Sequence, residues 1–516
     1  MQNSFREFVL HRDGLPGPDN GLPAPGPGFA WSSPGRPRRL RRTWLDTFDW
    51  RLYHAGLTLE QDAAGPGTRL TLTGRDGTVL AAEPAARGLA WPAKIDALPP
   101  GPLREQLAPV VGVRALAPVA RAVSLVREQR ALNSDEKTVA RVAVDTMSVS
   151  YPAPARPPDR LTVAAVRGYQ AQASRLAAAL AAAPGIAAAT QPALDAALAA
   201  AGRRPGDYSG KIGVELAPRM PAAAALATVL TALLDTLEAN VPGTIRDLDT
   251  EFLHDLRVAV RRSRSALKLA GSVLPAELTG KYRPEFKWLG DLTTPARDLD
   301  VFLLEYPAMA ASLTAATPQE LEPFRDHLTR QRAAAHRQLA RGLRSARFRA
   351  LTGDWRDALG GPAGRPRPSA ARLAAGRIAL AHQRVLRGGA AITAASPAKA
   401  LHDLRKRCKE LRYLLEIFGS LYDPAVHWKA VKELKGLQDC LGEFQDTQVQ
   451  HDKIKAFAAE MITARTGPAP ALLAMGEIAA GLMARQRRAR GEFAGRFRDF
   501  ASPASQDRIR ALTEAA

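Results

Sequence analysis

The chain has very little cysteine. Only two of its 516 residues are cysteines, Cys408 and Cys440, and both fall on apolar faces of predicted helices. Two cysteines cannot form a disulfide framework, and we interpret both as small buried hydrophobic residues in a reducing compartment. The sequence is therefore not typical of a small disulfide-stabilised secreted protein.

Long apolar runs are also missing. No stretch of about 18 or more consecutive apolar residues occurs, and the first residues carry scattered charges at Arg6, Glu7, Arg12 and Asp13. We therefore expect neither a membrane span nor a signal peptide. A cytoplasmic location without a membrane partner is the prediction.

Several sequence motifs of catalysis are absent. We find no Walker loop, no glycine-rich dinucleotide turn after a strand, no His-Glu-x-x-His segment, no paired cysteine ligands and no nucleophile elbow. We therefore predict no catalytic residues, no metal ligands and no cofactor.

Positive charge, in contrast, is abundant. The chain has 72 Lys and Arg against 51 Asp and Glu, a net charge of +21, and a pI near 10.5. From Thr244 to the end, 45 basic and 30 acidic residues give +15, which leaves +6 for the first 243 residues. This distribution indicates an acidic partner for the second half of the chain.

Two basic segments that begin with histidine repeat within this second half. Residues 254–264 read HDLRVAVRRSR and residues 402–412 read HDLRKRCKELR, at an offset of 402 − 254 = 148. A second pair keeps the same offset, because LGD at 289–291 corresponds to LQD at 437–439 and Asp298 corresponds to Asp446. The pattern indicates a duplicated helical unit.

Each basic segment predicts a helix with a cationic ridge. Residues at i, i+3, i+7 and i+10 share one face of a helix, and an apolar stripe runs one residue earlier. The ridge residues are His254, Arg257, Arg261 and Arg264 in the first copy and His402, Arg405, Lys409 and Arg412 in the second.

These ridges favour an anion with many charges as the ligand. Four like charges on one helix face repel each other, and folding does not require them. The ridge positions match between the copies, whereas neighbouring positions such as Val258 and Lys406 differ. Two alternatives stay open: the ridges could be ordinary solvated faces, and the histidines could brace the helix start through the backbone or through Asp298 or Asp446.

The pattern of elements predicts an α+β front domain and an all-helical back domain. Residues 14–38 are rich in proline and glycine and predict a loop. The front domain is expected over 1–210, with strands at 69–73, 139–144 and 161–166 and helices at about 170–183 and 190–201. The helical domain is expected over 216–510, with repeats at 216–355 and 369–500 joined at 360–368. Its helices are predicted at 221–240, 246–271, 279–292, 296–313, 318–349, 369–388, 398–420, 425–441, 443–464 and 470–500.

The helical half resembles a known family. HDLRVAVRRSRSALK and LHDLRKRCKELRYLLE, followed by ARDLDVFL and LKGLQDCLGEFQD, resemble the two signatures of the CHAD domain, the conserved histidine α-helical domain. The resemblance covers about 216–500. It implies two four-helix bundles related by a pseudo-two-fold axis, with a basic central cavity that binds inorganic polyphosphate. On this basis the eight ridge residues are expected to line the site. Secondary contributors, for which a solvated face is the alternative, are Arg332, His336, Arg384, Arg387, Arg485 and Arg488.

The front half resembles the CYTH fold, an eight-stranded antiparallel tunnel that holds triphosphates and metal. The resemblance lies in WLDTFDWRL at 44–52, AGLTL at 55–59 and VRGY at 166–169. The family's Glu-x-Glu-x-Lys signature is not present, because residues 4–11 read SFREFVLH, and the family's Leu-Arg-x-Arg is replaced by LEQD at 59–62. We therefore expect a degenerate, non-catalytic tunnel or barrel, and a divalent metal only if this domain were active.

Three functions are compatible with these observations. The favoured one is binding of inorganic polyphosphate, as a scaffold or targeting element at polyphosphate granules. The second is an inorganic triphosphatase that acts through the front tunnel, which the altered signatures argue against. The third is nucleic-acid binding, which the scarcity of aromatic residues beside the ridges disfavours, since little remains for base stacking.

Overall fold

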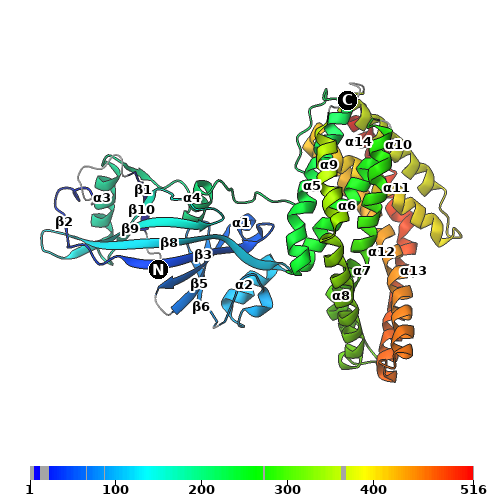
Figure 1. Ribbon diagram of the computed structural model, residues 1–516, viewed down its shortest axis with the longest axis horizontal. Helices are drawn as coiled ribbons and strands as arrows, with labels where there is room; N and C mark the ends of the chain where they lie inside the picture. The colour runs from blue at the N-terminus through cyan, green and yellow to red at the C-terminus, as the bar shows by residue number, and fades with distance from the viewer. Residues whose placement is uncertain are drawn as a thin grey trace. The chain divides into compact units, whose positions relative to one another are not determined.

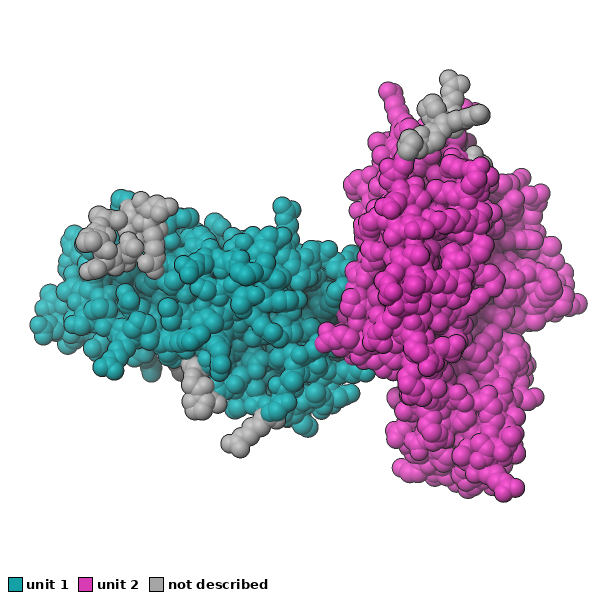
Figure 2. Space-filling model, viewed as in Figure 1, with its two compact units in different colours: residues 1–209 teal, residues 210–516 magenta. Residues whose placement is uncertain are grey.

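The architecture comes from a computed structural model that describes residues 5–11, 22–64, 67–86, 88–270, 273–361 and 368–514. The chain divides into two compact units, Met1–Ser209 and Gly210–Ala516, which Figure 2 shows in different colours. Each unit is described by itself. Residues 14–21 of the predicted loop and 362–367 of the predicted joint lie outside the described residues.

The first unit is built on an eleven-stranded sheet whose described pairs are all antiparallel. The strand order is β11-β1-β10-β9-β8-β3-β4-β5-β6, and β2 and β7 also pair with β8 (Figure 1). The strands are β1 (Phe5–Leu10), β2 (Ala30–Trp31), β3 (Arg38–Thr47), β4 (Leu57–Ala64), β5 (Gly67–Gly74), β6 (Val79–Pro84), β7 (Ala93–Lys94), β8 (Ala115–Leu132), β9 (Thr138–Tyr151), β10 (Asp159–Ala165) and β11 (Ile186–Ala188). The predicted strands 69–73 and 139–144 lie within β5 and β9, and the predicted strand 161–166 overlaps β10, which ends at Ala165.

Short helices cover apolar patches of this sheet. They are α1 (Arg51–His54), α2 (Pro102–Val111), α3 (Gln170–Ala181) and α4 (Ala193–Ala200). Helix α3 buries Leu176 and Leu180 in one cluster with Val142 and Leu161 of the sheet, and α4 buries Leu198 in another. Alternation along the strands supplies one apolar face, which is why the helices pack there. The antiparallel α+β class predicted for the front half is confirmed.

The second unit is all-helical, as predicted. Its α-helices are α5 (Ala222–Arg246), α6 (Thr250–Ala270), α7 (Ala276–Ala311), α8 (Glu322–Leu343), α9 (Ala346–Gly360), α10 (Ala370–Ala390), α11 (Ala398–Ile417), α12 (Pro424–Thr463), α13 (Ala469–Phe500) and α14 (Pro503–Glu514). Helices α10, α11 and α12 each begin 148 residues after α5, α6 and α7, since 370 − 222, 398 − 250 and 424 − 276 are all 148. The helices therefore keep the register of the sequence repeat.

Equivalent parts of the two copies contact each other. The backbone N–H of Ala222 donates to the carbonyl of Pro368 at 2.9 Å, and that of Ala370 donates to the carbonyl of Met220 at 2.7 Å. Helix α5 contacts α10, and α6 contacts α11. Contacts between equivalent elements are what a two-fold relation between the copies produces.

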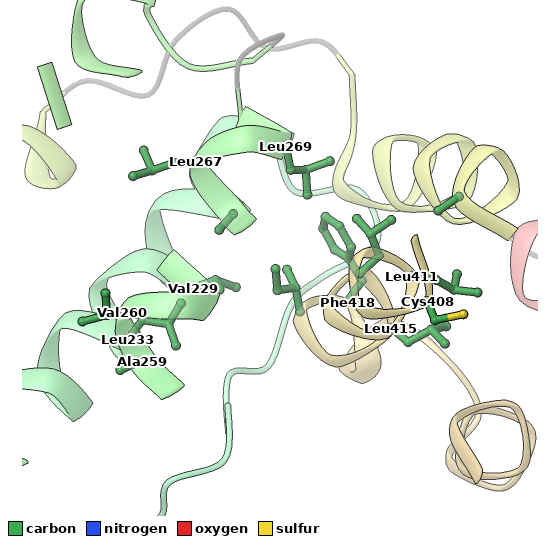
Figure 3. Packing of buried hydrophobic residues seen from close by; sticks show 14 of the residues in the cluster. Val229, Leu233, Ala259, Val260, Leu267, Leu269, Cys408, Leu411, Leu415 and Phe418 are labelled. Carbon is green, nitrogen blue, oxygen red and sulfur yellow. The ribbon is translucent and has the colours of Figure 1, made fainter. Parts of the chain in front are cut away.

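One hydrophobic core extends through both copies. Figure 3 shows Val229, Leu233 and Val260 of the first copy in the same cluster as Leu411 and Leu415 of the second. Cys408 is fully buried in this cluster, and Cys440 is also buried. Burial raises the pKa of Cys408 to about 12, so its thiol stays protonated. Both cysteines therefore have the surroundings of small core residues.

Two helices continue where the sequence predicted a break. The segments 279–292 and 296–313 form one helix, α7, which contains Pro284, Pro295 and Pro307. Pro295 has no N–H, so the carbonyl of Asp291 loses its helical donor, but Asp291 lies on the exposed side of the helix, where water can donate to it. The segments 425–441 and 443–464 also form one helix, α12, because a single glycine inside a helix costs only about 1 kcal/mol.

Elsewhere the structure has a break that was not predicted. The expected helix 318–349 is a short 3-10 turn (Pro318–Leu321) followed by α8 and α9. Ser345 separates α8 from α9, and its hydroxyl accepts a hydrogen bond from the backbone N–H of Phe348 at 3.2 Å, a helix N-cap. Helix α14 follows the predicted end at 500 and buries Ile509 and Leu512. Each copy therefore has a short fifth helix, α9 or α14, beyond the four-helix bundle that the family resemblance implied.

Helix α5 passes the length and composition test for a membrane span. Its most apolar window has a mean hydropathy of 1.5, and half of that window is buried. Leu226, Leu230 and Leu237 are buried in the core of the helical unit. Core helices of soluble proteins have the same properties, so this one helix is weak evidence for a span.

Candidate anion-binding site

A cavity of about 430 Å³ lies among four helices of the second unit. It is bordered by α6 and α7 of the first copy and by α11 and α12 of the second. Its lining residues are His254, Arg257, Val258, Arg261, Arg297, Asp298, Val301, Phe302, Arg405, Lys409, Asp446, Val449, Gln450 and Lys453. The two copies of the repeat therefore converge on one site, which we call the basic cavity.

The lining of the basic cavity is strongly positive. Six Lys and Arg side chains face two Asp side chains, so the net charge is +4 when His254 is neutral. Five of the eight predicted ridge residues are here: His254, Arg257, Arg261, Arg405 and Lys409. Cations from separate helices are held together because the hydrophobic core between α6 and α11 fixes the two ridges side by side.

Arg257 is positioned by α7. Its Nη1 donates to the carbonyl of Gly290 at 3.2 Å and to the hydroxyl groups of Thr293 and Thr294 at 3.3 and 2.5 Å. Burial lowers the pKa of Arg257, while the nearby carboxylate of Asp298 raises it. An arginine stays protonated in either case, and its planar group carries five N–H donors, more than these acceptors use.

Both aspartates of the basic cavity are paired with cations. Nη2 of Arg405 donates to Asp446 at 2.9 and 3.0 Å, and Nζ of Lys453 donates to Asp298. The second pair joins α12 of the second copy to α7 of the first. These ion pairs hold the cations in place, and an incoming anion would compete with the two carboxylates.

Cations of the two ridges are close enough to perturb each other. Burial, reinforced by Arg405 and Arg261, lowers the pKa of Lys409 to about 8. The guanidinium of Arg261 lies 5.8 Å from the ring centroid of Tyr413 on α11, so this side chain crosses toward the other copy. Mutual repulsion of this kind is relieved when an anion binds between the cations.

The two histidines differ in their surroundings. His254 lines the basic cavity, and burial followed by the charge of Arg297 lowers its pKa. His402 lies within 2.8 Å of Gln445, from Nδ1 to Oε1. Gln445 is the counterpart of Arg297 in the repeat, since 445 − 297 = 148. His402 is therefore held by the paired segment, through Gln445 instead of the expected Asp446, whereas His254 lines the cavity.

Three predicted ridge residues lie outside the described lining of the basic cavity: His402, Arg264 and Arg412. Arg412 Nε donates to Glu416 at 2.7 Å, and the same carboxylate holds Arg262 at 3.0 Å. Arg264 is exposed next to Gly290. Arg264 and Arg412 are at position i+10 of their ridges, about 15 Å along the helix axis from position i, and this distance places them beyond the cavity.

The six secondary candidates do not line the described basic cavity either. Arg332 Nε donates to Asp300 at 2.8 Å and its Nη1 pairs with Asp247, which together raise its pKa. His336 Nε2 lies 2.8 Å from the carbonyl of Thr244. These two residues connect α8 to the helices beside it. The other four are exposed, Arg384 and Arg387 on α10 and Arg485 and Arg488 on α13.

Sequence reasoning missed two cations of the basic cavity, Arg297 and Lys453. Their repeat counterparts are Gln445 and Glu305, so a search for positions that match between the copies passes over them. A signal was nevertheless present, because Arg297 adjoins Asp298, and Lys453 lies one heptad after Asp446 on the same helix face.

The carboxylates that the sequence singled out in the front unit are paired with arginines. Glu60 accepts hydrogen bonds from Nε and Nη2 of Arg42 at 2.5 and 2.8 Å, and Glu7 accepts from Arg160. Asp145 also accepts from Arg42, at 3.1 Å. Within the described ranges, no group of three or more His, Cys, Asp or Glu side chains is arranged to hold a metal ion.

The helices and the cavity together define a duplicated helical domain with a positively charged central site. Residues 228–455 match the family model of the CHAD domain. The chain therefore carries a CHAD domain, as the sequence resemblance predicted.

Several solved structures are similar to parts of this chain. The CHAD domain from the plant Ricinus communis is 25% identical, with a TM-score of 0.44 over 60% of this chain and 96% of that chain. PptA from Streptomyces chartreusis is 20% identical, with a TM-score of 0.43 over 54% of this chain and 99% of that chain. A Bacillus halodurans protein provisionally named an adenylate cyclase is 12% identical, with a TM-score of 0.24 over 31% of this chain and 81% of that chain. A comparison with curated protein sequences finds no significant match.

Proposed function

We propose that the basic cavity binds inorganic polyphosphate. The observation that carries the proposal is the convergence of both ridges: Arg257 and Arg261 of one copy share a cavity with Arg405 and Lys409 of the other. Folding does not require like charges to be gathered across an interface, because they repel. A polyanion that bridges the copies explains the arrangement, and CHAD domains have been linked to polyphosphate.

The size and charge of the basic cavity suit a short run of phosphates. A volume of about 430 Å³ is within the range of sites that hold small ligands, about 300–1,000 Å³. A bridging phosphate carries about one negative charge, so about four consecutive phosphates would balance the net charge of +4. A longer chain would extend beyond the cavity at one or both ends.

The donor types also favour phosphate over a nucleic acid. Five arginine and lysine side chains from three helices, together with Lys453, can reach phosphate oxygens, and arginine forms paired hydrogen bonds to them. Phe302 is the one aromatic residue among the lining residues, whereas proteins that bind single strands stack successive bases on several aromatic side chains.

In the cell, this binding would make the protein a scaffold or targeting element at polyphosphate granules. The role assigns the recognition of polyphosphate to the second unit. It requires no catalytic step in the first unit, where the singled-out glutamates pair with arginines.

The test is a binding titration of the full-length chain with long-chain polyphosphate and with duplex DNA, at matched phosphate concentration and at two salt concentrations. Counterion release lets any basic protein bind polyanions at low salt, so the comparison at higher salt is decisive. We expect polyphosphate binding to persist there while DNA binding is lost. Equal loss of both would refute a shaped polyphosphate site and would indicate a merely cationic surface.

A further inference from the structure

A second hollow lies on the surface of the helical unit and shares no lining residue with the basic cavity. It has a volume of about 420 Å³ and lies along α12 and α13. It is lined by Trp428, Lys429, Lys432, Glu433, Gly436, Leu437, Arg496 and Asp499. We call it the Trp428 hollow.

An exposed tryptophan forms one side of this hollow. The Trp428 side chain is 59% exposed, whereas tryptophan side chains are on average largely buried. Nζ of Lys432 lies 4.9 Å from the ring centroid, so a cation is already close to the ring. A large exposed aromatic ring is suited to stacking with another planar ring.

Positive charges lie around the Trp428 ring, and they suit a planar ligand that also carries negative charge. Lys429, Lys432 and Arg496 supply three cations. Of the two carboxylates, Glu433 is neutralised by Arg508, whose Nε lies 3.1 Å from it. Arg496 is only loosely paired, at 3.9 Å from Glu492. The cations can therefore bind phosphate, and Asp499 can accept a hydrogen bond from an amino group on a ring edge.

We propose that the Trp428 hollow binds a nucleoside phosphate. The base stacks on Trp428, the phosphates bind to Lys429, Lys432 and Arg496, and Asp499 accepts from an amino group of the base. A longer nucleic-acid strand fits less well, because strand-binding grooves present successive aromatic residues along a continuous positive path. Here one aromatic ring lies among the lining residues, and the neighbouring hollow carries Asp439, Glu443 and Glu492 against three arginines.

The experiment measures equilibrium binding of Mg-ATP to the full-length chain. It is done in an Arg257→Ala/Arg405→Ala background as well as in the wild type, so that phosphate binding in the basic cavity does not contribute. Adenosine and inorganic triphosphate are the comparison ligands, since each carries one half of the proposed recognition. In the variant background we expect ATP to bind more tightly than either comparison ligand.

Substitution of the ring gives the sharpest test. Trp428→Ala should weaken ATP binding about tenfold, in keeping with the cost of losing one stacked base, and Trp428→Phe should restore most of the affinity. Leu473→Ala, at another exposed apolar residue (74% exposed), is the matched control and should leave the affinity unchanged.

Two outcomes would overturn the proposal. The first is equal affinity for ATP and inorganic triphosphate with no effect of Trp428→Ala, which would mean simple anion binding. The second is Trp428-dependent binding of single-stranded RNA that exceeds ATP binding, which would assign the hollow to a strand. Because the basic cavity is disabled in one background, neither outcome depends on the polyphosphate proposal.

Discussion

Replacement of Arg257 and Arg405 by alanine tests whether one ligand bridges the two copies. The two residues are repeat counterparts, since 405 − 257 = 148, and both line the basic cavity. If one polyphosphate chain occupies that cavity, each single substitution removes a contact to the same ligand. Loss of affinity is then expected from both.

The expected magnitude follows from the contacts. A hydrogen bond to a charged group contributes about 1.5–3 kcal/mol, so the loss of either guanidinium should weaken binding by about 30-fold for a cost of about 2 kcal/mol. Arg405→Ala also leaves Asp446 without its partner. Asp446 is 60% exposed, so its added repulsion is limited to at most about 1 kcal/mol, or about another fivefold.

The assay is a titration of full-length variants with long-chain polyphosphate at several salt concentrations. Loss of one phosphate contact should lower the slope of log K against log salt by about 0.7–1 for each variant. Arg387→Ala, at an exposed arginine on α10, and Arg412→Ala, at an arginine paired with Glu416, are the controls and should change affinity little. Thermal unfolding of each variant checks that the fold is intact.

A difference between the two variants would refute the shared ligand. If Arg257→Ala alone, or Arg405→Ala alone, reduces affinity while the other variant binds like wild type, the two ridges do not share a ligand. An effect of Arg412→Ala as large as that of Arg405→Ala would show that the ligand follows the ridge along the helix instead of entering the cavity.

Three further predictions concern pH and stability. Polyphosphate affinity should fall as the pH rises through about 8, because Lys409 then loses the proton that makes it a cation. Lys409→Arg should abolish this fall in affinity in a pH titration. An unchanged fall in the variant would assign it to another group. The hydroxyl of Thr314 and the backbone N–H groups of residues 314–316 lower the pKa of Glu477 to about 2. The stabilising effect of the Glu477 carboxylate is therefore present above its ordinary pKa of 4.5 and is lost as the pH falls toward 2. Glu477→Gln should lower the unfolding temperature at pH 7 and have less effect near pH 2, whereas equal effects at both pH values would contradict this pH dependence. Gly389→Ala should destabilise the helical unit by about 1–3 kcal/mol, because the new Cβ would lie 1.9 Å from Cε2 of Phe497. Gly376→Ala on the same helix, where the new Cβ has no atom within 4 Å, should stabilise the unit by about 0.5–1 kcal/mol. Denaturant unfolding measures both changes, and equal effects would mean that Phe497 moves aside.

Helix positions were predictable where periodicity was strong, and helix ends were less so. The α6 and α11 segments carry an apolar stripe beside a basic one, and both form helices close to the predicted ranges. The predicted break at Pro295 was wrong, because residues of α7 on both sides of the proline, such as Leu289 and Leu299, are buried, and a propensity argument does not include that packing. The missed break between α8 and α9 depends on a single capping serine, Ser345.

The sequence alone determined that two related helices each present a basic ridge, because the spacing of charged and apolar residues along one helix specifies which of them share a face. Only the tertiary structure decided which ridge residues meet. Packing of α6 against α11 brings Arg257, Arg261, Arg405 and Lys409 to one cavity, while Arg264 and Arg412 lie about 15 Å along their helices from the ridge start. Arg297 and Lys453 join the site from α7 and α12, and their position beside the two ridges depends on how the apolar faces of the helices pack.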